Sequence, residues 1–297
     1  MKSHEPSAIL YALLAAVFYA LNAPGSKLLL NSVEPTTMAG LLYVGAGLGV
    51  GALWLARRAT GRLPRQANDL LVPADAPYVM GMVVLDIAAP ILLMLSLTRA
   101  NASTVSLLNN FEIVATTVIA LVLFGEKVSP RLWAGIALIT VASIVLSLED
   151  VDSLRPSLGA LLALAATCCW GLENNCTRRI ASRNTYQIVC IKGLCSGAGS
   201  LVVARVMGEG LPAPAPTLAA LVLGFVAYGL SIFCYIRAQG SLGAAKTSAY
   251  YAVAPFIGAA LGLALLHEAL SPAYFVALAI MVVGTVVVTA DTLGAAR

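Results

Sequence analysis

The stretch Gly-Glu-Lys-Val-Ser-Pro at Gly125–Pro130 recurs in related form as His-Glu-Ala-Leu-Ser-Pro at His267–Pro272. Both stretches belong to a longer match, because 102–147 aligns with 244–289 at a constant offset of 142 residues and without gaps. A match of this length indicates that the chain consists of two related halves. The two copies therefore have to be explained by one fold plan.

The composition indicates that this plan is built in a membrane. Hydrophobic residues make up 60% of the 297 residues, and charged residues only 11%. A soluble domain carries about 25% charged residues, so we predict an integral membrane protein. Apolar segments near the required length of about 20 residues lie at 7–30, 36–56, 76–98, 102–124, 130–148, 157–180, 184–207, 216–237, 243–266 and 272–291.

These segments fall equally into the two halves, which we place at 1–150 and 151–297. Because each half has five predicted spans, an odd number, the second half enters the bilayer from the opposite side. The expected fold class is an all-α integral membrane protein with ten transmembrane helices in two inverted five-helix repeats (5+5). This plan is common among secondary transporters.

The distribution of Lys and Arg predicts the orientation. With the N-terminus inside, twelve basic residues lie on the inner side and four on the outer side. The inner residues are Lys2, Arg57, Arg58, Arg62, Arg65, Lys127, Arg131, Arg178, Arg179, Arg183, Arg237 and Arg297; the outer ones are Lys27, Arg99, Arg155 and Arg205. We therefore expect a multi-pass protein of the plasma or inner membrane with both termini in the cytoplasm.

Two carboxylic acids interrupt the apolar segments at similar depth. Asp86 and Glu112 each lie about ten residues from either end of their segments. Both are thus predicted near the middle of the bilayer, where an ionised acid costs roughly 2.5–3.5 kcal/mol on insertion scales. Such residues usually mark a substrate or ion pathway, although an acid can also serve as a structural hydrogen-bond partner between helices.

More polar residues surround Glu112 in the predicted fourth span. Asn109, Glu112 and Thr116 are spaced to share one helix face, and Asn110 flanks them. Asparagine amides offer donors and acceptors that can orient a carboxylate or a polar ligand. The alternative is polar contact between helices, worth about 0.6 kcal/mol each.

Other spans add aromatic and polar candidates. Tyr19 and Asn22 share one face of the first span, Trp170 lies in the sixth, and Tyr250 and Tyr251 lie in the ninth. A buried cationic ligand would gain from aromatic faces together with acids. We expect these residues to line the same site as the two acids.

A third acid, Glu173, lies nearer the inner end of its span than Glu112. It can join the site or form a salt bridge with Arg178 or Lys192, while Lys192 and Lys246 are expected near the rim of an acidic cavity. The predicted substrate- or ion-binding residues are Asp86, Glu112, Asn109, Asn110, Asn22, Tyr19, Glu173, Trp170, Tyr250 and Tyr251.

Three prolines fall inside the predicted spans, at Pro24, Pro90 and Pro255. Proline has no N–H, so it cannot bond the carbonyl four residues before it. Freed carbonyls at membrane depth are tolerated where they line a cavity, although a proline can also simply shape a helix. The carbonyls in question belong to Ala20, Asp86 and Tyr251.

The glutamates of the repeated stretch, Glu126 and Glu268, each end a predicted helix. We expect each to cap its own helix or the next one. Zinc binding through His267-Glu268 is not expected, since Ser271 stands where an H-E-x-x-H motif needs its second histidine. No nucleotide-binding loop is present either. The sequence predicts no cofactor, metal site or nucleic-acid partner.

The repeated Gly-Glu or His-Glu step, with Ser-Pro shortly after it in a 5+5 chain, resembles the EamA-type transporters of the drug/metabolite transporter (DMT) superfamily. The stretch from Pro255 to Glu268 is similar to that family's helix that begins at proline and ends at glutamate. The resemblance implies ten spans and transport, and family members include exporters of amino acids and other metabolites. One departure is Ile113, preceded by Glu112, where the second half has Pro255.

The sequence thus predicts a secondary-active transporter rather than an enzyme. The expected substrate is a small cationic or zwitterionic metabolite, such as an amino acid or amine, exported by proton antiport. A buried carboxyl group can bind a proton because burial disfavours its charged form. Open alternatives are an exporter of a neutral or apolar compound, a facilitator without proton coupling and, more remotely, an intramembrane enzyme.

Overall fold

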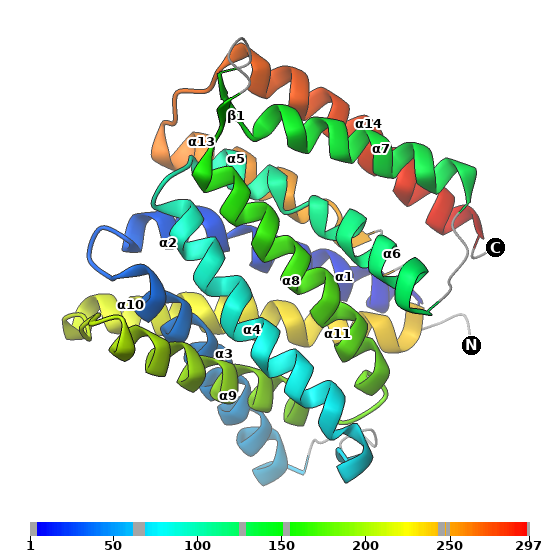
Figure 1. Ribbon diagram of the computed structural model, residues 1–297. Coiled ribbons are helices and arrows are strands. Elements are labelled where there is room, and N and C mark those ends of the chain that lie inside the picture. The colour runs from blue at the N-terminus through cyan, green and yellow to red at the C-terminus, as the bar shows by residue number, and fades with distance from the viewer. Residues whose placement is uncertain are drawn as a thin grey trace.

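The computed structural model describes residues 5–61, 69–124, 129–150, 155–242, 247 and 250–295 (Figure 1). A short 3-10 turn, η2 (Pro73–Asp75), precedes α4, and a π-helical turn, η3 (Phe225–Leu230), joins α10 to α11. The link between the halves contains a small antiparallel ribbon of β1 (Leu148–Asp150) and β2 (Arg155–Pro156). The helices are α1 (Glu5–Ala20), α2 (Asn22–Leu29), α3 (Pro35–Ala59), α4 (Ala76–Leu97), α5 (Ala102–Leu108), α6 (Phe111–Phe124), α7 (Pro130–Leu146), α8 (Leu158–Ile180), α9 (Thr185–Val206), α10 (Pro214–Gly224), α11 (Ser231–Leu242), α13 (Ala254–Leu266) and α14 (Pro272–Ala295).

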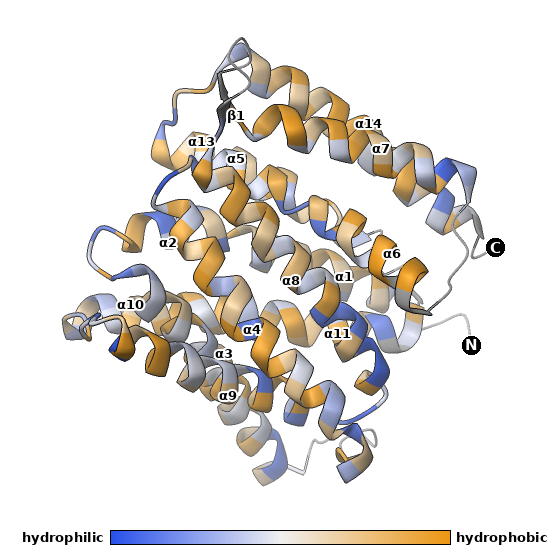
Figure 2. Cartoon of the chain, viewed as in Figure 1, coloured by the Kyte–Doolittle hydropathy of each residue, from blue (hydrophilic) through white to orange (hydrophobic). Residues whose placement is uncertain are grey.

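The predicted class, a helical multi-pass membrane protein, is confirmed. Within the described residues, six helical segments are long and apolar enough to cross a membrane, and α7 and α13 are shorter apolar helices. Figure 2 shows hydrophobic residues along the flanks of the bundle, with hydrophilic residues near many helix ends and along part of α8. The six segments are Pro6–Leu29, Pro35–Ala59, Pro73–Leu97, Thr185–Val206, Pro214–Gln239 and Pro272–Gly294.

The main helix contacts join the first half of the chain to the second. The pairs are α3 with α9, α4 with α8, α1 with α11, α5 with α13, and α7 with α14. Glycines allow the α3–α9 pair to approach closely: a Cβ on Gly193 would lie 2.4 Å from the nitrogen of Gly47. Small residues at such crossings are typical of helix packing in membranes. There the hydrophobic effect does not drive helices together, so close van der Waals packing contributes more. The centre of the bundle is therefore built from both halves.

Three helices are interrupted near the middle of the bundle. Leu21 separates α1 from α2, Asn109 and Asn110 separate α5 from α6, and Ala252 and Val253 form a turn before α13. At the second break the backbone hydrogen bonds reach three residues back instead of four. The N–H of Asn110 donates to the carbonyl of Leu107, and that of Glu112 donates to the carbonyl of Asn109. The breaks bring backbone ends and polar side chains to the centre of the protein.

The three prolines differ in their surroundings. Pro24 and Pro255 lie in the first turns of α2 and α13, directly after a break. Pro90, in contrast, lies inside α4, which continues on both sides of it. Two of these three prolines thus mark a helix start. Both helices, α2 and α13, border the small cavity that is described below as the break cavity.

Glu268 caps a helix of the other half. Its carboxylate accepts hydrogen bonds from the N–H groups of Ala102 (2.6 Å) and Ser103 (2.9 Å), at the start of α5. The prediction that Glu268 caps its own or the next helix is wrong. α13 ends at Leu266 and is followed by His267 in a left-handed conformation (φ 50°). The carboxylate after it meets the N–H groups at the start of α5, which have no partner within their own helix. Glu126 lies outside the described residues.

Candidate substrate site

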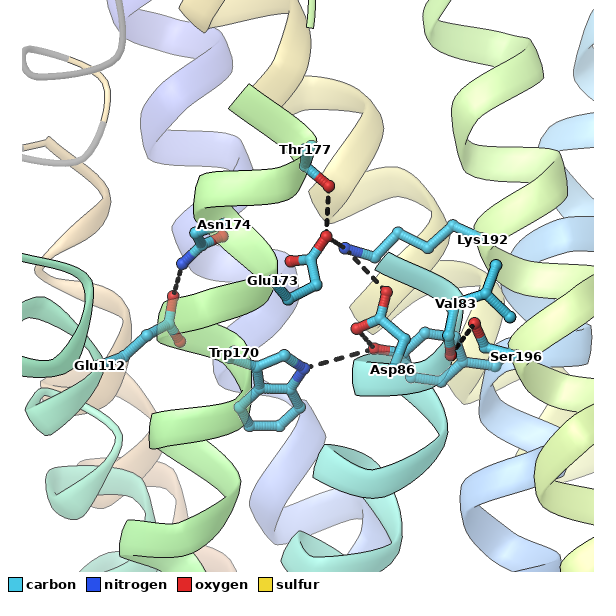
Figure 3. A network of polar contacts seen from close by, with 10 residues as sticks. Val83, Asp86, Glu112, Trp170, Glu173, Asn174, Thr177, Lys192 and Ser196 are labelled. Carbon is cyan, nitrogen blue, oxygen red and sulfur yellow. Dashed lines mark hydrogen bonds and ion pairs between the residues drawn. The ribbon is translucent and has the colours of Figure 1, made fainter. Parts of the chain in front are cut away.

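A charge triad of Asp86, Lys192 and Glu173 is buried between α4, α8 and α9 (Figure 3). The Nζ of Lys192 on α9 lies 3.1 Å from Oδ2 of Asp86 on α4 and 2.9 Å from Oε1 of Glu173 on α8. The exposed fractions are 0% for Asp86, 2% for Glu173 and 6% for Lys192. One ammonium group therefore bridges two carboxylates that have almost no access to solvent.

Hydroxyl groups complete the triad. Tyr43 on α3 donates a hydrogen bond of 2.8 Å to Oδ1 of Asp86, and Thr177 donates to Oε1 of Glu173. The Nε1 of Trp170 donates in turn to the hydroxyl of Tyr43 at 3.5 Å. Buried charges are stable only when they are paired and hydrogen-bonded, and this network supplies both kinds of partner.

The salt bridge between Glu173 and Lys192, one of the expectations for Glu173, is present, and it also includes Asp86. The other expectation, that Glu173 belongs to the binding site, stays a prediction. The expectation that Lys192 lies near the rim of a cavity is wrong, because α9 packs tightly on α3 and carries Lys192 inward. Lys246 lies outside the described residues. When all three groups are ionised, the triad keeps one negative charge.

Glu112 lies on the opposite side of α8 from Asp86 (Figure 3). Its Oε1 accepts a hydrogen bond of 2.6 Å from Nδ2 of Asn174, the residue after Glu173. Successive residues on a helix point about 100° apart, so α8 directs Glu173 towards the triad and Asn174 towards Glu112. Glu112 is half-buried, and within the described residues it forms no ion pair. The two acids first predicted therefore have different neighbours.

An aromatic cluster fills the space between the two halves next to these acids. The ring centroid of Tyr19 lies 6.4 Å from Trp170, 6.0 Å from Tyr228 and 5.8 Å from Tyr251. Tyr228 also packs against Tyr43, with centroids 5.0 Å apart. Trp170 also lies one turn of α8 before Asn174, the residue that donates to Glu112. The cluster thus extends from the triad towards Glu112.

Asn22 and Tyr250 have different places. The Nδ2 of Asn22 donates a 2.9 Å hydrogen bond to the hydroxyl of Tyr228, and Ser26 donates to Oδ1 of Asn22 at 3.1 Å. Asn22 therefore orients the aromatic cluster. Tyr250 is half-buried and forms no ring contact with that cluster in the described part of the chain. The structure brings its neighbour Tyr251 into the cluster because adjacent residues point in different directions.

Asn109 and Asn110 lie at the break between α5 and α6 and are buried, with exposed fractions of 6% and 1%. Neither Oδ1 of Asn109 nor the side-chain amide atoms of Asn110 hydrogen-bond to the residues that the structure describes. Asn109 borders a small cavity of ≈ 10 Å³, which we call the break cavity. Its lining includes Tyr19, Ala20, Ser106, Asn109, Pro255 and Gly258.

Sequence reasoning missed several members of the site. Tyr43 and Tyr228 were overlooked, although each is a tyrosine well inside an apolar segment and such a position is itself a signal. Asn174 directly follows Glu173, but nothing in the sequence indicates that it meets Glu112. Among the described residues, no group of His, Cys, Asp or Glu side chains is arranged to hold a metal ion.

Comparison with known proteins identifies a family with this architecture. A model of the EamA-like transporter family matches the chain twice, at residues 6–148 and 157–290. The chain belongs to the EamA-like transporter family. The resemblance predicted from the repeated stretch and from Pro255 to Glu268 is thereby confirmed. The family and the relatives are transporters, which agrees with the expectation that this chain is not an enzyme.

Named relatives of this EamA-like transporter cover most of its length. An uncharacterized transporter of Methanothermobacter thermautotrophicus is 22% identical over 86% of this chain and 78% of its own. An S-adenosylmethionine/S-adenosylhomocysteine transporter of Chlamydia trachomatis serovar L2 is 27% identical, covering 93% of this chain and 87% of its own. The protein of that name from Chlamydia muridarum is 26% identical, over 94% and 91%.

A solved crystal structure shares the fold. It matches with a TM-score of 0.67 and 20% sequence identity, and the match covers 97% of this chain and 98% of that one. At this identity the likeness concerns the arrangement of helices. The EamA-like transporter therefore shares its architecture with a protein of known structure over nearly its whole length.

Proposed function

We propose that this chain is a secondary-active transporter that exports a small cationic or zwitterionic metabolite by proton antiport. In this proposal ten spans form two inverted five-helix repeats, 1–150 and 151–297, in the plasma or inner membrane. Both termini face the cytoplasm. The substrate site lies between the halves, at the charge triad, Glu112 and the aromatic cluster.

The helix arrangement supports the inverted repeat. Each main contact pairs a helix of the first half with one of the second, which is a natural result of two intertwined copies. Asn109, at the break between α5 and α6, aligns with Tyr251 at the offset of 142 residues. Tyr251 lies directly before the break that precedes α13. Broken helices at matching positions of two repeats are typical of transporter binding sites. In Figure 1 the start of α1 and the end of α14 lie on the same side of the molecule, as the proposed topology requires.

The observation that carries the proposal is the unbalanced charge at the centre. One buried ammonium group serves two buried carboxylates, and among the described residues Glu112 has only an amide as partner. An excess of negative charge in apolar surroundings favours a bound proton or an organic cation. The aromatic faces beside it would stabilise the same cation.

Antiport follows if Glu112 binds either a proton or the cationic substrate, but not both. Protonation from outside then releases the substrate there, and the proton leaves when the site faces inward. Asp86 is held by Lys192 and maintains the geometry. Asn109 and Asn22 orient the ligand and the aromatic rings around it.

The named relatives suggest a specific pair of test compounds. S-adenosylmethionine carries a sulfonium cation and an amino-acid group, whereas S-adenosylhomocysteine lacks the sulfonium charge. The first compound has the charge that Glu112 would attract and an adenine ring that the aromatic cluster could stack on. We propose compounds of this class as first candidates for the substrate.

A second candidate function is export of a neutral, largely apolar compound, or facilitated passage without proton coupling. It is favoured by Lys192, which offsets one of the central acids, and by the five aromatic rings of the cluster. In that case the acids would only bind protons or stabilise the fold. The two candidates differ in the charge of the compounds that compete for transport.

Transport in proteoliposomes tests the proposal. Vesicles containing the purified chain are loaded with labelled S-adenosylmethionine, S-adenosylhomocysteine, amino acids or amines, with and without a pH gradient. We expect export of cationic or zwitterionic compounds that is faster with the gradient. Transport of neutral compounds alone, without an effect of pH, would favour the second candidate. Inhibition by organic anions alone would contradict both.

Cysteine labelling tests the topology. A probe introduced at Glu34 should react with an impermeant reagent from outside, whereas one at the exposed Ser182, between α8 and α9, should not. The reason is that the positively charged segments are expected to remain in the cytoplasm. The reverse pattern would contradict the proposed orientation.

A further inference from the structure

The break cavity lies where three interrupted helices meet. It is bordered by Tyr19 and Ala20 at the end of α1, by Ser106 and Asn109 at the end of α5, and by Gly258 near the start of α13. Its volume of ≈ 10 Å³ is about that needed for one water-sized group. The charge triad does not line it. The cavity is thus a separate small compartment, next to the aromatic cluster through Tyr19.

Oxygen atoms at this cavity lack donors. Oδ1 of Asn109 is buried and accepts no hydrogen bond from the described residues. The carbonyl of Ala20 would normally bond the N–H four residues later, but that position is Pro24, which has none. The C-terminal end of α1 also carries the negative end of its helix dipole. One residue with an unpaired amide oxygen and one with a freed carbonyl therefore line the same small space.

Gly258 keeps this space open. A Cβ at that position would lie 2.9 Å from Oγ of Ser106 and 3.2 Å from the carbonyl oxygen of Ala20. Both contacts are tighter than ordinary van der Waals packing, so a larger residue would fill the compartment. The glycine thus brings α13 close to the oxygens of α1 and α5 without covering them.

We propose that the break cavity binds one compact monovalent cationic group, either Na⁺ or a primary ammonium group of the substrate. Oxygen acceptors without donors favour such a group, and the volume excludes a larger one. Freed backbone carbonyls and the C-terminal ends of broken helices bind coupling ions in other transporter folds. The inference deepens the proposed transport function, on which it rests, by assigning a second binding point in addition to Glu112.

Fluorescence of Trp170 can report occupancy, because its ring lies 6.4 Å from Tyr19, which borders the cavity. The full chain is reconstituted in nanodiscs with Trp54→Phe and Trp133→Phe, which leaves Trp170 as the single tryptophan. NaCl and methylammonium chloride are titrated separately, with choline chloride holding the ionic strength constant. We expect a saturable change with at least one of the two small cations and none with choline.

Two glycine variants provide a matched comparison. Gly258→Ala fills the cavity, whereas Gly262→Ala introduces a still tighter contact one turn later, 2.7 Å from Oγ of Ser103, and Gly262 does not line the cavity. We expect Gly262→Ala to keep the response and Gly258→Ala to lose it. Asn109→Leu, which removes the acceptor, should raise the cation concentration for half-maximal response by about tenfold or more.

The pattern of responses identifies the ligand. A response to Na⁺ alone assigns a coupling ion, and a response to methylammonium assigns the substrate's amine. No response to either cation in the parent protein would overturn the proposal, as would an unchanged response in Asn109→Leu or in folded Gly258→Ala. Binding is measured here without transport, so failure of this inference and failure of the transport assay are distinct outcomes.

Discussion

The two sides of α8 surround their acids in two different ways. On one side, Glu173 and Asp86 share the ammonium group of Lys192 and receive hydroxyl donors from Thr177 and Tyr43. On the other side, Glu112 has a single donor within the part of the chain that the structure describes, the amide of Asn174. One carboxylate site is thus balanced largely by a built-in cation, and the other is not.

The difference suggests a division of labour. A buried carboxylate that is already paired with a cation has little to gain from a proton or a substrate. One that is bound only by an amide remains in a state where either ligand lowers its free energy. We therefore assign structure chiefly to the triad and exchange chiefly to Glu112.

Removing the cation of the triad should have the largest effect. Lys192→Met leaves two buried carboxylates together without a counter-charge, and breaking a buried pair typically costs about 3–5 kcal/mol of stability. We expect a marked drop in the thermal unfolding temperature of the purified protein. The control, Lys192→Met combined with Asp86→Asn and Glu173→Gln, should recover most of it. A single variant as stable as the parent would show that the triad is not ionised as described.

An intermediate effect is expected for Asp86→Asn. The change keeps the shape of the side chain and leaves Lys192 paired one-to-one with Glu173, so the charge of the triad becomes zero. The protein should fold, and transport should fall less than it does when Glu112 is changed. Transport rates in proteoliposomes at equal protein content check this. If Asp86→Asn abolishes proton coupling while Glu112→Gln does not, the roles of the two sides are reversed.

The smallest effect is expected for Asn174→Ala. It removes one hydrogen bond to Glu112, which is worth about 1 kcal/mol net. Stability should fall by about that amount, and proton-driven export should persist with altered pH dependence. Asn175→Ala is a suitable comparison, because the Asn175 amide bonds the carbonyls of Gly171 and Thr116 rather than Glu112. An identical pH dependence in both variants would mean that Asn174 does not act through Glu112.

The sequence predicted the acids on the two sides of α8 but not the residues that they contact. Asp86, Glu112 and Glu173 were recognised because an acid in an apolar segment is costly and therefore informative. Helical spacing also predicted that Tyr19 and Asn22 share one face. Which neighbour a face meets depends on packing between distant helices. Close approach at Gly47 and Gly193 carries Lys192 inward, and no local pattern in α9 reveals this.

The same limit applies at the helix ends. That Glu268 caps a helix could be expected from its position at the end of an apolar segment. That it caps α5 could not, because the choice depends on the left-handed turn at His267 and on the crossing of α13 with α5. The unpaired amides of Asn109 and Asn110 are likewise a consequence of the break, which the helical periodicity of the span does not show.

The most direct test measures whether substrate and proton exchange at Glu112. Proteoliposomes with a trapped pH-sensitive dye are given S-adenosylmethionine, or the best cationic substrate from the transport screen, and proton movement is followed together with substrate flux. The parent protein should move protons against substrate, while Glu112→Gln should fold normally, exchange substrate and move no protons. If Glu112→Gln transports with an unchanged pH profile and unchanged proton movement, Glu112 is a structural hydrogen-bond partner and the proposed mechanism is wrong.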